Sequence, residues 1–229
     1  MGNQNRFTTQ TRRIRKNNTF IILAAGAGRR MACYGPKCLL TYQNETVLDY
    51  QIKTIRNFDL NAEIIVVAGF HARRIIGKMD HRIRIIENVR YDETNSVESL
   101  RLALNACIPG NVYVIHGDII FSPAALSPKK EECWVFVDDC GRIPKTEVGA
   151  VSVDGSVTNL SYGLKQGWGQ IAYITYEHFE DAKKILSIID KNSSTFEFIN
   201  KMIKRGVKFV PYKNNKCVLK EIGSIKDLE

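Results

Sequence analysis

Short apolar runs alternate with amphipathic segments through the first half of the chain. Runs rich in β-branched and bulky residues predict buried strands at residues 19–23, 62–68, 83–86 and 112–115. Between them, apolar side chains recur at helical spacing in residues 46–58, 71–79 and 97–104. Strands separated by helices in this order are typical of a parallel sheet wound with crossover helices.

The pattern becomes less regular after residue 130. Strands are predicted at residues 134–138, 149–153, 157–160, 171–174 and 207–210, and helices at residues 177–189 and 195–205. Asp154-Gly155 predicts a tight hairpin turn between two of these strands. The predicted fold is therefore α/β. It is a single Rossmann-like three-layer domain with a mostly parallel mixed sheet, helices on both faces and a small antiparallel flap in the second half.

The composition agrees with one globular domain. The chain has 229 residues, of which 44% are hydrophobic and 25% charged, enough for one sizeable domain and short for two. No apolar run approaches the roughly 20 residues of a membrane-spanning helix, so no membrane partner is expected. The N-terminus lacks the apolar segment of a signal peptide, which predicts a cytoplasmic protein. The six cysteines show no zinc-type spacing and are expected to be free thiols.

The net charge of +9 is concentrated at the N-terminus. Residues 1–18 hold five Arg or Lys and no acid, so they account for five of the nine excess charges. We assign them to a basic flexible extension and residues 19–229 to the folded domain. The remaining excess is modest, and we do not expect a nucleic-acid partner.

The most informative stretch follows the first predicted strand, at residues 23–40 (LAAGAGRRMACYGPKCLL). Its small residues let the backbone pass close to a ligand. Backbone N–H groups at the end of a strand can cradle phosphate, and the cations Arg30 and Lys37 can hold its charge. The stretch predicts a phosphate-binding loop whose nucleotide-binding residues are Leu23, Ala24, Ala25, Gly26 and Gly28.

Three motifs compete for this loop. A Walker loop requires Gly-Lys-Ser/Thr, but Gly28 is followed by two arginines. A dinucleotide fingerprint requires Gly or Ala three residues after Gly28, where Met31 stands. The third motif is Leu-Ala-Ala-Gly-x-Gly-x-Arg-Met at residues 23–31, followed by Pro-Lys-x-Leu at residues 36–39. This stretch resembles the signature of the nucleotidyltransferases that make nucleotide sugars and CDP-alcohols.

A second segment, residues 88–100 (NVRYDETNSVESL), is similar to the bacterial choline-phosphate cytidylyltransferases and their relatives. From the residues alone, Asn95 or Ser96 caps a helix. The resemblance implies that this segment passes beside the nucleotide base, which makes Thr94, Asn95 and Ser96 candidates for hydrogen bonds to the base. Capping and base binding both remain open for these three residues.

Asp118 follows the predicted strand at residues 112–115, at the edge where open parallel sheets bind ligands. A carboxylate there, facing a phosphate loop, is a natural ligand for Mg²⁺, and the resemblance assigns the corresponding Gly-Asp to the metal. The family's second metal-binding acid would lie in Glu221-Ile222-Gly223. Because Gly223 carries no acid, either Glu221 takes this role or Asp118 works with water and phosphate oxygens.

The resemblance places the wall for the second substrate near residues 163–174. Trp168 and Gln170 are the candidate acceptor-binding residues, with Tyr162 and Lys165 beside them. We expect the acceptor to be a sugar 1-phosphate or a similar small phosphorylated alcohol. Choline phosphate is the alternative. Its quaternary ammonium would require an aromatic cage, for which Trp134, Trp168 and Tyr162 are available.

These features predict a Mg²⁺-dependent nucleotidyltransferase that joins an NTP to a small phosphorylated acceptor and releases pyrophosphate. Arg30 would stabilise the departing β,γ-phosphates, and Lys37 would bridge the acceptor phosphate and the α-phosphate. A degenerate nucleotide-binding regulatory module without catalysis is an alternative, suggested by Gly223. A glycosyltransferase that uses nucleotide sugars is another, but residues 116–118 (His-Gly-Asp) hold one acid where an Asp-x-Asp metal motif holds two.

Overall fold

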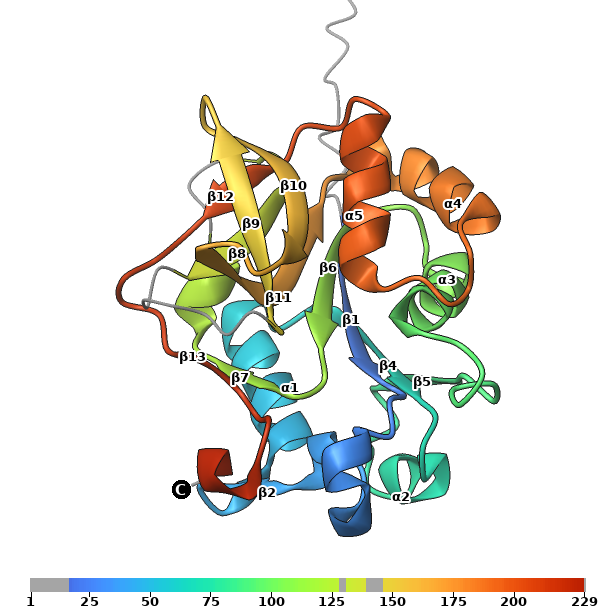
Figure 1. The fold of residues 1–229 in the computed structure, drawn as a ribbon. Coiled ribbons are helices and arrows are strands. Elements are labelled where there is room, and N and C mark those ends of the chain that lie inside the picture. Colours follow the sequence, from blue (N-terminus) through green and yellow to red (C-terminus); the bar gives the residue numbers. More distant parts are fainter. Residues whose placement is uncertain (1–16, 128–130, 139–145, 229) are drawn as a thin grey trace, which may run out of the picture.

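A computed structural model describes residues 17–127, 131–138 and 146–228 of the chain (Figure 1). Of the predicted N-terminal extension, residues 1–16 lie outside this described part. The centre is a sheet that is nine-stranded within the described ranges. Its parallel core runs in the order β5-β4-β1-β6 and consists of β1 (Asn18–Ala24), β4 (Glu63–Ala68), β5 (Arg84–Glu87) and β6 (Asn111–His116). All four strands begin and end within about two residues of the predicted bounds.

Helices cover both faces of this parallel core. Alternate residues of β1 face opposite sides, with Phe20 and Ile22 in one hydrophobic cluster and Ile21 and Leu23 in the other. The first cluster receives the apolar faces of α1 (Val47–Phe58) and α2 (Ala72–Ile76). The second receives α3 (Ser96–Ala106), α4 (Phe179–Ile188) and α5 (Thr195–Lys204), which lie together on one side of the sheet in Figure 1. The predicted three-layer α/β architecture is confirmed.

Antiparallel strands extend the sheet beyond β6. The longest is β11 (Gln166–Ile174), which pairs with β6 near its end and with β9 near its start. The predicted hairpin is formed by β9 (Val148–Val153) and β10 (Ser156–Tyr162), while β8 (Trp134–Asp138) joins β11 to β12 (Val210–Tyr212). The first half of β11, Gln-Gly-Trp-Gly-Gln, lacks the apolar alternation of a strand, which is why only residues 171–174 were expected.

Two small strand pairs complete the fold. One is the hairpin of β2 (Thr41–Tyr42) with β3 (Glu45–Thr46). The other pairs β7 (Ile119–Phe121) with β13 (Leu219–Glu221), which brings the C-terminal segment against the strand that follows Asp118. Neither pair was predicted, because strands of two or three residues carry too little pattern. The short 3-10 helices are Arg29–Tyr34, Lys37–Leu39, Pro123–Leu126, Tyr176–His178 and Ile225–Leu228.

The order of the core strands creates a crevice at one end of the sheet. The chain moves from β1 to β4 and β5 on one side and returns to β6 on the other, so the loops after β1 and β6 diverge. The two loops are joined at their bases, where Gly117 N donates to Leu23 O at 2.9 Å. A Cβ on Gly117 would lie 2.9 Å from Leu23 O and 3.0 Å from Ala24 Cα, so only glycine fits this contact.

Two further sequence expectations bear on the described part of the chain. None of its helices has the length and apolar character needed to span a bilayer. Cys33, Cys38, Cys107, Cys133 and Cys217 are free thiols, as predicted, whereas Cys140 lies outside the described residues.

Replacing Gly117 by alanine tests the contact between the two loops. We expect Gly117→Ala to lower the free energy of unfolding by about 1–3 kcal/mol, because the added Cβ meets backbone atoms that cannot move aside. Gly26→Ala is the matched control, since nothing lies within 4 Å of a Cβ at that position. Urea denaturation should place the control within about 0.5 kcal/mol of the wild type. Equal stability of the two variants would contradict the close packing.

Candidate active site

A cavity of about 1170 Å³ lies at the crevice between the loops after β1 and β6. Its lining comes from these two loops, the start of α3, the antiparallel strands and the C-terminal segment. The lining includes all the predicted site residues except Arg30: Leu23, Ala24, Ala25, Gly26, Gly28, Lys37, Thr94, Asn95, Ser96, Asp118, Trp168, Gln170 and Glu221. The side chain of Arg30 lies outside the described part of the chain. Positions almost 200 residues apart in sequence therefore meet around one space.

The predicted phosphate-binding loop presents Lys37 to Asp118. Gly28 has a left-handed backbone, φ +55°, and a Cβ there would come within 3.0 Å of Lys37 Cε. The missing side chain therefore lets the stem of Lys37 lie against the loop. Lys37 Nζ donates to Asp118 Oδ2 at 2.8 Å, and the two side chains are only 16% and 23% exposed. This partly buried ion pair joins the two predicted motifs directly.

Asp118 sits in a turn that is held by neighbouring elements. From α1, the buried Gln51 donates through Nε2 to His116 O at 2.8 Å and to Ile119 O at 2.7 Å. From the C-terminal segment, Ile222 N donates to Asp118 O at 2.8 Å. Gln51 lies on the inward face of a predicted amphipathic helix, and a polar residue at such a position is the one signal that could have identified it.

Uncharged side chains surround the ion pair on the inner side of the cavity. The His116 and Trp168 rings meet edge to face, with centroids 5.4 Å apart and an interplanar angle of 82°. Burial lowers the pKa of His116 from its usual value, which favours the neutral imidazole. Burial also raises the pKa of the Cys38 thiol to about 12, so it stays protonated. Because Cys38 and Trp168 are buried, electrostatic interactions on this side of the cavity are stronger than in bulk water.

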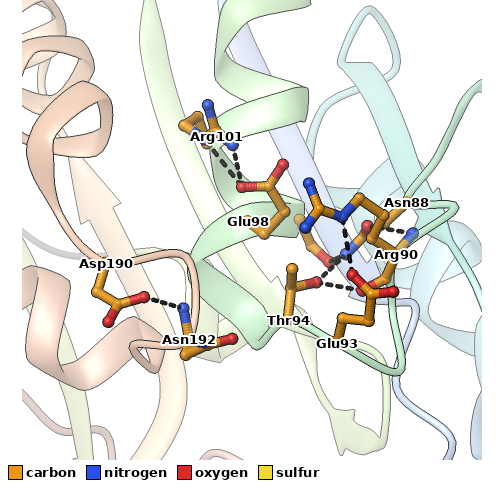
Figure 2. A network of polar contacts seen from close by, with 9 residues as sticks. Asn88, Arg90, Glu93, Thr94, Glu98, Arg101, Asp190 and Asn192 are labelled. Carbon is orange, nitrogen blue, oxygen red and sulfur yellow. Dashed lines mark hydrogen bonds and ion pairs between the residues drawn. The ribbon is translucent and has the colours of Figure 1, made fainter.

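The polar residues at the start of α3 line the cavity and also hold their own loop together. Thr94 Oγ1 donates to Arg90 O at 2.6 Å and accepts from Asn88 Nδ2 at 3.1 Å, as Figure 2 shows. Asn95 is the N-cap, and its side chain accepts from Ser96 N at 2.8 Å. The capping prediction is confirmed, and contact with a nucleotide base remains a prediction.

Ser96 joins this loop to the start of α5. Its hydroxyl accepts from Thr195 N at 2.9 Å and lies 2.8 Å from Thr195 Oγ1. The backbone contributes two more hydrogen bonds, from Asn95 N to Lys191 O and from Val97 N to Ser193 O. The loop beside the predicted base site and the segment before α5 therefore form one wall of the cavity.

On the opposite side, Gln170 and Glu221 project from different strands and meet. Gln170 Nε2 donates to Glu221 Oε2 at 2.5 Å, so the structure brings together a predicted acceptor-binding residue and a predicted metal ligand. Tyr162 also lines the cavity, whereas Lys165 is not among the described lining residues. Trp134 is fully buried in the core and cannot contribute to a cage around an acceptor.

Several lining residues were not predicted from the sequence. Glu147 precedes β9, Phe196 lies in the first turn of α5, and Asp227 belongs to the C-terminal 3-10 helix. The Phe196 and Tyr162 rings meet edge to face, with their centroids 5.4 Å apart. No local pattern distinguishes these residues from ordinary surface or packing positions, because their place at the cavity comes only from the arrangement of distant elements.

Comparison with known proteins gives three concordant matches. Residues 20–133 match the family model described as the MobA-like NTP transferase domain. The CTP:phosphoglutamine cytidylyltransferase of Campylobacter jejuni is 31% identical over 132 residues, which cover 52% of this chain. The match spans about half of that relative, 51% of its length. The choline-phosphate cytidylyltransferase of Streptococcus pneumoniae is 27% identical over 198 residues, 82% of this chain and 84% of the relative.

The fold is also similar to a solved structure of the CTP:phosphocholine cytidylyltransferase from Streptococcus pneumoniae. The TM-score is 0.75 at 19% identity, covering 92% of this chain and 96% of that one. The family model, for its part, spans the strands β1 and β6 and both loops that carry the Lys37–Asp118 pair. The chain belongs to the nucleotidyltransferase superfamily, a family of transferase enzymes.

Proposed function

We propose that the protein couples an NTP to a small phosphorylated acceptor and releases pyrophosphate. The observation that carries this proposal is the Lys37–Asp118 pair, a cation and a carboxylate 2.8 Å apart beside a loop of small residues. An acceptor phosphate oxygen would attack the α-phosphorus of the NTP. The bond from that phosphorus to the oxygen bridging to the β-phosphate would break, and pyrophosphate would leave. The reaction needs no nucleophilic side chain, so positioning and charge neutralisation supply the catalysis.

Each part of the phosphate loop has a role in this reaction. The backbone N–H groups near Ala25, Gly26 and Gly28 would bind the NTP phosphates. Lys37 would lie between the acceptor phosphate and the α-phosphate and reduce the repulsion between these anions. Arg30 would stabilise charge on the departing pyrophosphate. Lys37 is already held at the cavity by Asp118, so little reorganisation is required of it.

Asp118 and Glu221 would hold Mg²⁺. The two residues are close in the backbone, because Ile222 N bonds Asp118 O at 2.8 Å, and both line the cavity. Within the described ranges, no three His, Cys, Asp or Glu side chains gather into a metal cluster. Mg²⁺ suits a site of one or two carboxylates, because it keeps water and substrate phosphate oxygens as its other ligands. When bound, it would neutralise charge developing on the phosphates.

The charge of the cavity supports a requirement for cations. Its described lining holds four carboxylates, Asp118, Glu147, Glu221 and Asp227, and one lysine, Lys37. A nucleoside triphosphate adds further negative charge, which like charges in the lining oppose. A divalent cation that enters with the nucleotide would relieve this repulsion.

We propose CTP as the nucleotide, because the relatives matched by sequence are named as cytidylyltransferases. For the acceptor we propose a sugar 1-phosphate or a similar small phosphorylated alcohol, bound against Trp168. Choline phosphate is the second candidate. The edge-to-face pair of Tyr162 and Phe196 lies beside Glu147, whose carbonyl accepts from Gly163 N at 3.2 Å. Tyr162, Phe196 and Glu147 all line the cavity, and aromatic rings and a carboxylate in one lining suit an ammonium group.

Pyrophosphate release tests this proposal directly. The protein would be incubated with Mg²⁺, each of the four NTPs and a panel of sugar 1-phosphates with choline phosphate. We expect release with CTP and one class of acceptor. Release with choline phosphate alone would establish the second candidate. NTP binding without release from any pair would favour the regulatory module over the enzyme.

Removing either member of the ion pair should abolish most activity. We expect Lys37→Ala and Asp118→Ala each to lower kcat by about 10²-fold or more, because each removes an electrostatic group from the reacting phosphates. Lys53→Ala is the matched control, since Lys53 forms a surface ion pair with Glu45 at 3.3 Å. Steady-state kinetics would measure all three variants. Near-normal turnover in either ion-pair variant would contradict the assignment.

Replacing Gln51 tests whether its hydrogen bonds hold the turn that carries Asp118. Gln51→Met keeps a similar size but removes both hydrogen bonds to the carbonyls of His116 and Ile119. We expect a loss of about 1–3 kcal/mol in the free energy of unfolding, because buried carbonyls lose their donor. We also expect kcat to fall, because Asp118 would shift from its position when the turn loses these hydrogen bonds. Gln43→Met, the same change at an exposed position, should alter neither quantity.

A further inference from the structure

Strand β11 carries an irregularity at the point where it meets the cavity. Its register with β8 shifts between Trp168, which pairs with Val137, and Ala172, which pairs with Val135. Three residues of β11 lie between these pairs and only one of β8, so β11 has two extra residues here. On its other side, β11 changes neighbour from β9 to β6 across the same interval. The bulge therefore marks the junction between the flap and the parallel core.

The bulge is fixed by packing on several sides. The Trp168 ring meets His116 at the end of β6. At Gly169, a Cβ would lie 2.7 Å from Phe136 Cδ1 and 2.9 Å from Leu219 Cδ1, so the backbone itself packs against β8 and β13. Bulges often redirect a side chain beside an active site. Here the redirected residue is Gln170.

Gln170 adopts a conformation that glutamine disfavours. Its φ is +59°, in the left-handed region, which is energetically costly for a residue with a Cβ. Glycine would remove this cost but has no side chain. Backbone strain of this kind persists where the surrounding structure imposes it, and it concentrates at functional sites. The side chain of Gln170 donates from Nε2 to Glu221 Oε2 at 2.5 Å.

Glu221 is an exposed residue at the end of β13, a strand of three residues. Ordering a long, exposed side chain such as that of glutamate costs rotamer entropy. The hydrogen bond from the Gln170 amide restricts this freedom and orients the carboxylate.

We infer that Gln170 is a positioning residue that orients Glu221 for a divalent cation. This inference rests on the proposed function, in which Glu221 is a metal ligand. Gln170 then acts through Glu221, and the bulge in β11 sets where that carboxylate stands relative to Asp118. Outer hydrogen-bond partners of metal-binding carboxylates typically change metal affinity by about 10–100-fold when they are replaced.

The test is Mn²⁺ binding to the full chain, measured by electron paramagnetic resonance with and without CTP. Gln170→Asn is the informative change, because asparagine tolerates the left-handed backbone but is one methylene too short to keep the bond. We expect it to raise the Kd for Mn²⁺ by about 10-fold and to leave Tm unchanged. Gln43→Asn is the matched control, with the same substitution at an exposed residue of φ +46° outside the cavity lining.

A double-mutant cycle separates positioning from an independent effect. Glu221→Gln removes the carboxylate, so adding Gln170→Asn to it should cause no further loss of Mn²⁺ affinity. Additive losses would overturn the inference. So would a normal Mn²⁺ Kd for Gln170→Asn together with a raised KM for the acceptor, which would make Gln170 a direct acceptor contact.

Two further results distinguish a failure of the positioning role from a failure of the proposed reaction. Absence of Mn²⁺ binding to the wild-type chain, with CTP present as well as absent, would overturn the role of Gln170. Coupled loss of Mn²⁺ affinity in the cycle, without pyrophosphate release from any NTP and acceptor, would support the positioning role and contradict only the reaction.

Discussion

The parallel pairing of β1 with β6 is the constraint on which the site depends. It places Leu23 opposite His116, so the predicted phosphate-binding loop and the Asp118 turn leave the sheet side by side. The hydrogen bond from Gly117 N to Leu23 O fixes the spacing of the two loops at their bases. The ion pair between Lys37 and Asp118 then joins one loop to the other. A shift of one residue in this register would turn both loops to the wrong faces and separate the two charges.

The surroundings of this junction are buried on one side and acidic on the other. Behind Asp118 lie the buried side chains of Gln51, Cys38 and Trp168, with the partly buried His116 ring against Trp168. The open side carries Glu147 and Glu221, with the bulged strand β11 between the flap and the core. A buried, uncharged side and an acidic, open side together suit the proposed reaction between anions. Under the proposed function, the held charges of Lys37 and Asp118 would face the reacting phosphates, and further cations would arrive with the substrates at the acidic outer lining.

Much of the fold could be predicted because its elements are encoded locally. The apolar run at residues 62–68 forms β4, and the helical spacing in residues 46–58 forms α1, each within about one residue of its predicted bounds. Asn95 caps α3 as its side-chain chemistry predicts. The first half of β11 and the pairing of β7 with β13 could not be predicted, because these strands are specified by their neighbours and not by their own periodicity.

The sequence by itself determined the family resemblance, the alternation of strands and helices, and the two motifs that carry Lys37 and Asp118. These features depend on residues that are close in the chain or on a signature of small and basic residues. Only the tertiary structure decided that Gln51 supports Asp118, that Ser96 bonds Thr195, and that Gln170 meets Glu221. Each of these contacts joins residues about 50 to 100 positions apart. Their geometry follows from sheet order and a strand bulge, which no local pattern records.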